Sequence, residues 1–566
     1  MRPLHLSLAL AALLALGACT QTQAPRETPA NVEQDSPAPP ESSKKLGEVV
    51  VTATKRSHAS RKQAETYAPA MLVSIAMPRP VDRENYGRID PNPVHRVAED
   101  PVSTFSIDVD TGSYSNVRRM LNEGRLPPQD AVRVEELINY FDYAYAAPRD
   151  AATPFGVVTE VAPTPWNPKT RLLHVGIQGW KPDRTPAASN LVFLVDVSGS
   201  MEDRDKLPLV KSSLRLLARQ LSPADRISLV VYAGSTGVVL EPTPGSDKAT
   251  IAAALDRLEA GGSTNGGAGI ALAYAMAEKA FIPGGNNRVL LATDGDFNVG
   301  TVSFEALVDL VEEKRKGGVA LTTLGFGAGN YNDHLMEQLA DAGNGNHAYI
   351  DSLTEAQRVL VSQRDATLHT IARDVKIQVK FNPARVAEYR LIGYENRMLA
   401  REDFNNDKVD AGEIGAGDSV TALYEIALKG EGGERADPLR YGREPAAAAA
   451  GDELAFVKLR YKRPADGMQA ASRLIEQPVR AGAMQADAGS ASAQFRLAAA
   501  VAAYGQLLRG GEFTGDFDYD DVVALARSAR SADPESTRFV ELVKLADGLS
   551  TPAAQANLSG DARIDD

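Results

Sequence analysis

Hydrophobic residues between positions 190 and 372 form short continuous runs that alternate with longer amphipathic stretches. Runs such as LVFLV and VLLAT have the length and composition of strands that are buried on both faces. Strands that alternate with helices predict an α/β fold with a doubly wound, mostly parallel sheet. We expect strands at residues 191–195, 226–232, 237–240, 289–293, 320–326 and 347–350, and helices at residues 206–221, 248–258, 266–281, 303–316, 332–342 and 353–372.

The regions that flank this alternation follow other patterns. Apolar and polar residues alternate in several runs between 373 and 465, as they do in antiparallel strands, and the last hundred residues are rich in alanine, which predicts helices. The strands expected at 151–189 either join the two neighbouring regions or add an edge strand to the parallel sheet. The expected organisation is a signal segment at 1–18, a disordered tether at 19–90, an α+β block at 91–150, a β-rich connection at 151–189, the α/β domain at 190–372, a β-rich domain at 373–465, a helical region at 466–549 and a disordered tail at 550–566.

Polar oxygen-bearing residues follow two of the predicted buried strands. The segment DVSGS places Asp196, Ser198 and Ser200 directly after the first strand, Asp294 follows the fourth strand, and Thr264 lies in the glycine-rich loop GGSTNGG. Open α/β sheets bind their ligands at the carboxyl ends of the strands. Carboxylate and hydroxyl oxygens suit Mg²⁺ or Mn²⁺ better than zinc or copper. The sequence therefore predicts a metal site at this edge of the sheet.

The order of these segments resembles the metal-ion-dependent adhesion site of the von Willebrand factor A (VWA) family. That motif is Asp-x-Ser-x-Ser, then a threonine in a glycine-rich loop, then Thr-Asp-Gly at a strand end, and each of its positions has a counterpart in this chain. The resemblance implies that the two serines and the threonine ligate the metal directly, while the aspartates often act through water. It also implies a binding module, in which an Asp or Glu side chain of a protein partner completes the metal's coordination.

The flanking regions carry a resemblance of their own. The stretches FSIDVDTGSYSNVRRMLNEGRLPPQD and FNPARVAEYRLIGYENRMLAREDF are similar to the segments on either side of the VWA domain in bacterial YfbK-type proteins. The resemblance covers residues 92 to about 549 and implies a lipid-anchored envelope protein.

Four other functional classes are less well supported by the sequence. A net charge of −13 disfavours nucleic acid as a partner. A Rossmann nucleotide-binding fold shares the strand–helix alternation, but no GxGxxG fingerprint or P-loop is present. A metal-dependent hydrolase that uses a metal-activated water is an alternative to the binding module, although no GxSxG elbow and no placed base support it. A structural envelope scaffold is the last of the four classes.

The amino terminus has the pattern of an export signal. A positively charged start precedes an apolar stretch at residues 4–16, which is too short for a membrane-spanning helix. The stretch ends in LGAC, and Cys19 is the only cysteine, so disulfides within the chain are excluded. LGAC resembles the lipobox of bacterial lipoproteins, which implies cleavage before Cys19 and its acylation, and hence an anchor in a lipid membrane. Thr20, in place of an aspartate, favours the periplasmic face of the outer membrane. An ordinary signal peptide with an incidental cysteine is the alternative.

One short run interrupts the polar tether. Residues 48–55, EVVVTATK, begin at Glu48 and end at Lys55, and their β-branched side chains are typical of a strand that adds to the edge of another sheet. The run resembles a TonB box, which implies a TonB-like partner. A strand that docks on its own protein is the favoured alternative.

A second acidic pair, Asp108 and Asp110, precedes a predicted helix at residues 111–124. The pair could be taken for a metal site. The pattern instead favours Asp110 as the cap of that helix and Asp108 as a solvated residue.

Replacing Cys19 with serine tests the lipid anchor. A serine hydroxyl cannot take the thioether-linked lipid, so Cys19→Ser should lose labelling by palmitate and move from the membrane to the soluble periplasmic fraction. Thr20→Ser, a change of similar size at the neighbouring residue, should keep both the label and the membrane location. Membrane retention of Cys19→Ser at the wild-type level would rule out an anchor at this residue.

Overall fold

The computed structural model describes residues 83–551 except 149, 151, 183–186, 264–265, 296–302, 438–450, 468–469 and 532. The chain divides into two units, Met1–Met77 and Pro78–Asp566, and all described residues belong to the second. Cys19, Thr264 and residues 1–82, with the expected signal segment and the EVVVTATK run, lie outside the described residues. Within the described part of the chain, no helix has the length and apolarity that crossing a membrane requires.

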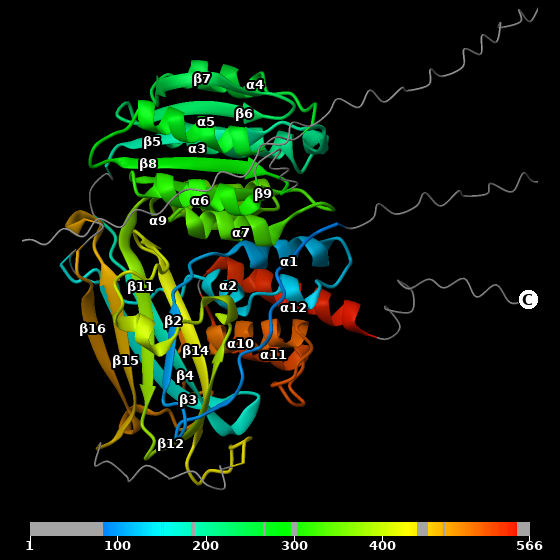
Figure 1. Cartoon of the computed structure of the whole chain (residues 1–566). Coiled ribbons are helices and arrows are strands. Elements are labelled where there is room, and N and C mark those ends of the chain that lie inside the picture. Colours follow the sequence, from blue (N-terminus) through cyan, green and yellow to red (C-terminus); the bar gives the residue numbers. More distant parts are fainter. Residues whose placement is uncertain are drawn as a thin grey trace, which may run out of the picture. The chain divides into compact units, whose positions relative to one another are not determined.

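A six-stranded sheet forms the centre of the α/β domain (Figure 1, green). Its order is β10-β9-β8-β5-β6-β7, and all neighbours are parallel except β7, which is an antiparallel edge strand. The strands are β5 (Ser189–Asp196), β6 (Arg226–Tyr232), β7 (Thr236–Pro244), β8 (Asn286–Thr293), β9 (Val319–Phe326) and β10 (His347–Ile350). The predicted doubly wound fold is confirmed.

Helices cover both faces of this sheet because the central strands are apolar on both faces. In β5, Leu191 and Phe193 belong to the core under α3 and α4, whereas Val192 and Leu194 belong to the core under α5 and α6. Both cores are fully enclosed, as expected for parallel strands. The helices are α3 (Leu207–Gln220), α4 (Lys248–Asp256), α5 (Gly266–Lys279), α6 (Phe304–Arg315), α7 (Asp333–Ala342) and α8 (Leu353–Gln357).

The predicted helix at 353–372 is wrong in its last part. Helix α8 is followed by a π-helical turn, Arg358–Ser362, and by the short α9 (Arg364–Leu368), and strand β11 begins at Thr370. The β-branched residues at 370 and 371 suit a strand, and β11 pairs there with β13.

Two antiparallel sheets lie beside the α/β domain and enclose one shared core. One sheet has the order β1-β12-β14-β4-β3, and the other has the order β13-β11-β15-β16, with β2 beside β11. Their strands are β1 (His95–Arg96), β2 (Val102–Ser106), β3 (Phe155–Thr164), β4 (Asn167–Gly179), β11 (Thr370–Phe381), β12 (Val386–Ile392), β13 (Ile414–Gly415), β14 (Ser419–Leu428), β15 (Glu453–Lys462) and β16 (Arg473–Arg480). Segments from before and after the α/β domain therefore share both sheets.

This pairing differs from the expected connections. Strands β3 and β4 do not add an edge to the parallel sheet, because β4 pairs with β14 and β3 pairs with β4. Strand β16 lies inside the region expected to be helical, and it forms an exposed edge beside β15.

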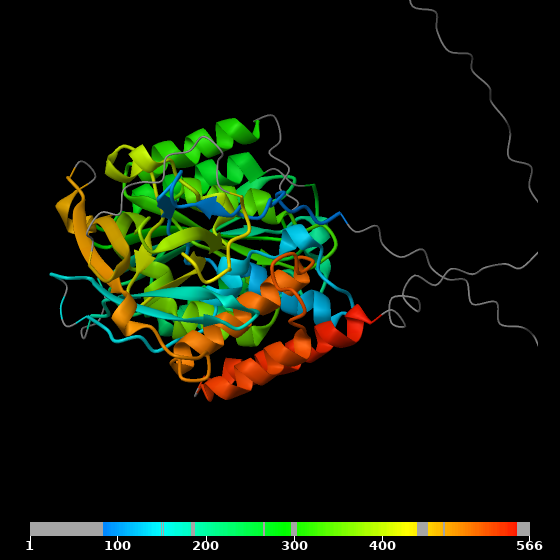
Figure 2. The same cartoon turned by 90° about the horizontal axis from the view of Figure 1, so that it is seen from below.

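Five helices pack on the first of these sheets and join the two ends of the described chain. Helices α1 (Gly112–Asn122) and α2 (Val134–Asn139) share a core with α10 (Ala493–Leu508), α11 (Tyr519–Ala529) and α12 (Pro534–Ser550). The rings of Phe141 and Phe539 meet edge to face with centroids 5.5 Å apart. Figure 2 shows α12 (red) along one side of these helices. We call the two antiparallel sheets and these five helices the body.

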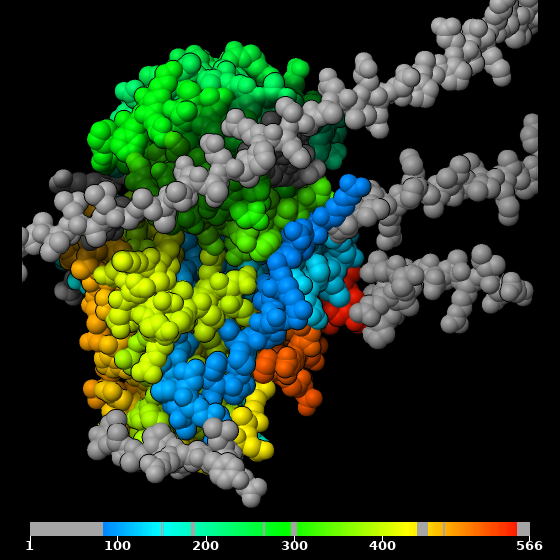
Figure 3. Space-filling model, in the orientation of Figure 1, coloured from blue at the N-terminus to red at the C-terminus, as the bar shows by residue number. Residues whose placement is uncertain are grey.

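An N-terminal strap, residues 83–89, runs over the body and reaches the α/β domain (Figure 3, blue). Its backbone donates from Arg83 N to Gly329 O at 2.8 Å and from Asn85 N to Tyr331 O at 2.9 Å. The buried carboxylate of Glu84 accepts from Gly329 N at 2.8 Å and pairs with Arg119 of α1. The strap therefore fastens the loop before α7 to the body.

Asp108 and Asp110 are buried at the junction between the body and the α/β domain, so the predicted cap and the predicted solvated residue are both wrong. The N-cap of α1 is Thr111, and no side chain caps it. Asp108 accepts from Arg397 Nε at 3.2 Å, and Asp110 Oδ1 accepts from the backbone N of His347 at 2.8 Å. The sequence pattern could not show that β10 lies against this segment.

Buried ion pairs hold the α/β domain on the body. The guanidinium of Arg133, from the body, contacts Asp333 and lies 3.7 Å from Glu337, both on α7. Arg397 reaches Glu337 from the other side at 3.3 Å. Removing one partner of such a pair costs about 3–5 kcal/mol, because the other charge stays buried without compensation.

Glu135 is a buried acid at this junction that forms no ion pair with a described residue. Its Oε2 atom has no hydrogen-bond partner. Burial, together with the nearby Glu395 and Asp108, raises the pKa of Glu135 from its ordinary 4.5 to about 8. The folded chain therefore holds this proton more tightly than the unfolded chain, and that stabilisation is lost as the pH rises from about 4.5 through about 8.

Glu135→Gln should remove this pH dependence, because the amide is neutral at every pH. We expect the melting temperature of the variant to exceed that of the wild type at pH 9 by roughly 2–4 °C and the gap to close near pH 5. Glu541→Gln, on the exposed face of α12, should follow the wild type throughout. Thermal unfolding by circular dichroism checks this, and parallel curves for wild type and Glu135→Gln would contradict it.

Candidate metal centre

Asp196 is the last residue of β5 and is fully buried at the carboxyl end of the parallel sheet. Its Oδ1 atom accepts from the backbone N of Ser198 at 2.8 Å, and its Oδ2 atom accepts from Thr293 Oγ1 at 2.9 Å. The first bond closes the turn after the strand. The second bond joins Asp196 to β8, the neighbouring strand, so the carboxylate is fixed in orientation.

Ser198 and Ser200 lie in the turn that follows, with their Oγ atoms 3.1 Å apart. The glycine-rich loop is bound to the same turn, because Gly261 N donates to Val197 O at 2.7 Å and Gly199 N donates to Gly262 O at 3.1 Å. Gly262 has a φ of +84°, a backbone conformation that favours glycine. The residue after next, Thr264, is the predicted ligand that lies outside the described residues.

Asp294 follows β8 directly and is fully buried. Its Oδ2 atom accepts from Lys206 Nζ at 3.1 Å and from Asn330 Nδ2 at 2.9 Å. Lys206 Nζ also donates to Asn330 Oδ1 at 2.9 Å, which closes a three-membered polar group. The parallel pairing of β5 with β8 therefore brings four of the five predicted site residues to one edge of the sheet.

Lys206, Asn330 and Thr293 are site residues that the sequence analysis missed. Lys206 is the N-cap of α3, and its stem packs against Gly327, where an added Cβ would collide with it. Asn330 lies in the loop held by the strap. Of the three, only Thr293 carried a sequence signal, because it belongs to the Thr-Asp-Gly segment. Lys206 follows Asp196 by ten residues, and no local pattern shows where its side chain points.

The site carries more negative than positive charge, with two carboxylates and one lysine. Burial raises the pKa of Asp196 to about 6, with the charge of Asp294 adding to the shift and the bonds from Ser198 and Thr293 opposing it. With both carboxylates ionised and Lys206 protonated, the group carries one net negative charge. A divalent cation would reverse it to one net positive charge.

The composition of the site fits a hard divalent cation. Two carboxylates and two hydroxyls offer oxygen atoms alone, which is the ligand set of Mg²⁺ and Mn²⁺. Among the described residues, no group of three or more His, Cys, Asp or Glu side chains could hold a metal ion. The candidate site instead combines two aspartates with the hydroxyl groups of two serines.

The sheet and the residues at its carboxyl edge define a VWA domain. The family model described as von Willebrand factor type A domain matches residues 190–363. The model described as Uncharacterized protein YfbK, C-terminal, matches residues 366–549, and a model described as von Willebrand factor matches residues 80–174. The Uncharacterized protein YfbK of Escherichia coli K12 is 47% identical over 501 residues, which cover 86% of this chain and 85% of that protein. The chain belongs to the YfbK family.

More distant proteins share parts of the chain. The human inter-alpha-trypsin inhibitor heavy chain H3 is 25% identical over 257 residues, which cover 42% of this chain and 28% of that protein. A solved structure titled von Willebrand factor type A from Catenulispora acidiphila has 16% identity and a TM-score of 0.42, and the match covers 71% of this chain and 91% of that one. The VWA domain gives this protein a role in protein–protein interaction or adhesion, and domains of this family commonly bind a divalent metal.

Lys206→Met tests whether the lysine competes with a metal at Asp294. Methionine keeps an unbranched side chain beside Gly327 and removes the ammonium. Without metal, the variant should lose about 3–5 kcal/mol of stability, because Asp294 loses its cation. Mg²⁺ should then raise its melting temperature more than that of the wild type and bind at least about tenfold more tightly.

Lys211→Met is the matched control on the same helix. Its Nζ donates to the carbonyl oxygens of Asp256 and Leu258, away from the site. This variant should respond to Mg²⁺ as the wild type does. Equal Mg²⁺ responses in calorimetry and thermal unfolding for Lys206→Met and Lys211→Met would show that Lys206 does not compete with the metal.

Proposed function

We propose that the VWA domain is a divalent-cation-dependent binding module that takes an acidic side chain of a protein partner. Mg²⁺, or Mn²⁺, would lie between Asp196, Ser198, Ser200, Thr264 and Asp294. The convergence of four of these residues at the carboxyl edge of β5 and β8 is the single observation that carries the proposal.

The charge of the site supports an acidic partner. The serines are neutral ligands, and Lys206 offsets one of the two carboxylates, so a bound Mg²⁺ would leave an excess positive charge at the edge of the domain. Mg²⁺ prefers six oxygen ligands in an octahedron. A carboxylate of a partner would supply one of them and neutralise the excess charge, which favours Asp or Glu over a neutral ligand.

The alternative of a metal-dependent hydrolase has less support. A metal-activated water needs a nearby proton acceptor. Four of the groups that contact the two aspartates donate to them: Ser198 N, Thr293 Oγ1, Lys206 Nζ and Asn330 Nδ2. These bonds fix the orientation of the carboxylates, which supports metal binding more than proton transfer.

The partner is proposed to be an envelope protein. The lipobox-like LGAC sequence supports an anchor at Cys19 and a position at the periplasmic face of the outer membrane. Residues 48–55 would either dock as a strand on this protein itself, which is the favoured alternative, or offer a second, TonB-like contact.

Capture of partners from a detergent-solubilised envelope extract tests the proposal. The full chain should retain a partner in Mg²⁺ and release it in EDTA. Asp196→Ala should retain none, because it removes charge and the acceptor that orients Ser198. Conversion of the carboxyl groups of the extract to amides should abolish capture, since the partner's carboxylate would be lost.

Asp256→Ala is the control for loss of an aspartate in the same domain. Asp256 lies on the surface, where it pairs with Arg215, and it has no contact with the site. Asp256→Ala should retain the partner in Mg²⁺ as the wild type does. Capture that persists in EDTA, or that Asp196→Ala retains, would place the interaction elsewhere. Capture that survives amidation of the extract would exclude an acidic ligand.

A further inference from the structure

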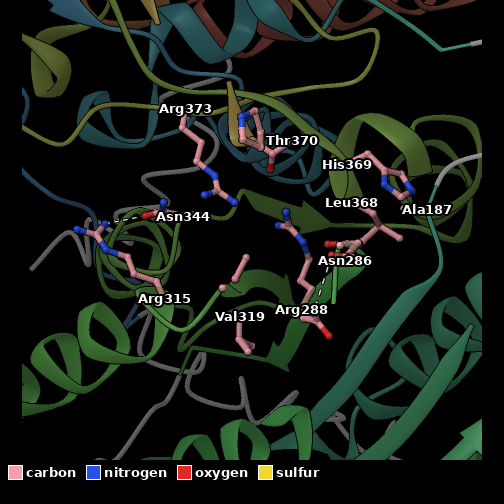
Figure 4. A pocket seen from close by; sticks show the side chains of 16 residues that line it. Ala187, Asn286, Arg288, Arg315, Val319, Asn344, Leu368, His369, Thr370 and Arg373 are labelled. Atoms are coloured by element: carbon pink, nitrogen blue, oxygen red, sulfur yellow. Dashed lines mark hydrogen bonds between the residues drawn. The ribbon is translucent and has the colours of Figure 1, made fainter. Parts of the chain in front are cut away.

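A cavity of about 230 Å³ lies at the opposite end of the parallel sheet from the metal centre, where the VWA domain meets the body (Figure 4). It opens at the amino-terminal ends of β8 and β9 and is closed on the other side by the start of β11. Its polar lining includes Asn286, Arg288 and Arg315 of the VWA domain and Thr370 and Arg373 of the body.

Arg288 is buried in the wall of this cavity without a carboxylate partner among the described residues. Only 2% of the residue is exposed. Its Nη1 atom donates to Thr322 Oγ1 at 2.5 Å and approaches Asn346 Oδ1 at 3.4 Å, both neutral groups, and its Nε atom has no hydrogen-bond partner. Buried charges in proteins are paired, because a lone guanidinium loses its hydration without compensation. A bound anion beside Arg288 would therefore compensate its charge.

Arg373 and Asn286 add further donors to the cavity. Figure 4 shows the guanidinium groups of Arg288 and Arg373 both pointing into the cavity, from opposite walls. Burial lowers the pKa of Arg288 to about 10, the charge of Glu413 opposes this shift, and the charge of Arg373 adds to it. The Nδ2 atom of Asn286 is buried there with no hydrogen-bond partner. An anion between the two guanidinium groups would be attracted by both charges and would accept from the amide of Asn286.

The acidic residues nearby do not fill this role for Arg288. Asp410 binds Arg315, and Asp374 pairs with Lys462 at 2.8 Å. Glu413 has an Oε1 atom without a hydrogen-bond partner, and burial raises its pKa well above 4.5. No described carboxylate oxygen lies close enough to Arg288 to form an ion pair, so the guanidinium is available to a ligand.

We propose that this cavity binds a small oxyanion, the phosphate or carboxylate group of a ligand, between Arg288 and Arg373, with the amide of Asn286 as a third donor. The volume holds a group of phosphate or dicarboxylate size, and it is smaller than the cavities that take larger organic ligands. Because Arg288 and Arg373 belong to the VWA domain and the body respectively, the anion would bridge the two. The site is separate from the proposed metal centre and does not depend on it.

Titration of the full chain with inorganic phosphate, and separately with glutarate, tests the site at constant ionic strength set by chloride. We expect one of the two to bind saturably in calorimetry and to raise the melting temperature by mass action. Binding of phosphate alone would identify a phosphate site, and binding of glutarate alone would identify a carboxylate site. Failure of both to bind more tightly than chloride overturns the proposal.

Arg288→Met and Arg373→Met should each weaken binding of that anion at least about tenfold, because each removes one guanidinium. Asn286→Ala should weaken it less, and it serves as the test if Arg288→Met does not fold. Arg257→Met is the control, since Arg257 lies outside the cavity and donates to Val239 O. Affinity unchanged in Arg373→Met and Asn286→Ala would overturn the proposal. So would an Arg288→Met protein that folds and binds the anion as tightly as the wild type.

Discussion

The parallel pairing of β5 with β8 is the constraint on which the candidate metal centre depends. Seven residue pairs in register, from Ser189 opposite Asn286 to Val195 opposite Ala292, carry both strands to the same edge of the sheet. Asp196 and Asp294 then follow at that edge, and the bond from Thr293 to Asp196 joins the two strand ends directly. The apolar residues on both faces of β5 hold this register, because a slip by one residue would exchange its two cores.

The same sheet has buried aspartates at its carboxyl edge and a buried arginine at its amino-terminal edge. At the carboxyl edge, two buried aspartates exceed the one lysine that neutralises them, and the site suits a cation. At the amino-terminal edge, Arg288 forms no ion pair with a described carboxylate, which supports the proposed anion site. Strand β8 contributes to both ends, through Asn286 and Arg288 at its start and through Asp294 just after its last residue. A buried group of unbalanced charge at each end is more typical of sites than of structural ion pairs.

The sequence predicted the parts of the fold that are local and apolar. The buried runs at β5 and β8 and the amphipathic helices between them follow from hydrophobic patterning, and the order of strand ends predicted that Asp196 and Asp294 would meet. The body could not be predicted in this way. Strand β4 pairs with β14 across some 240 residues of sequence, and no local pattern records that choice. Lys206 was missed, and Asp108 was wrongly predicted to be solvated, because their partners Asp294 and Arg397 are brought to them by tertiary packing.

The N-terminal strap has a mechanical consequence. The backbone N–H groups of Arg83 and Asn85 donate to the carbonyl oxygens of Gly329 and Tyr331. Asn330 lies between these two residues and donates to Asp294. A pulling force on the segment that precedes residue 83 would load these bonds before it reached the interior of the body. Tension along the N-terminal segment would therefore act on the edge of the VWA domain that carries Asp294, and the affinity of the proposed metal centre for a cation would depend on the applied force.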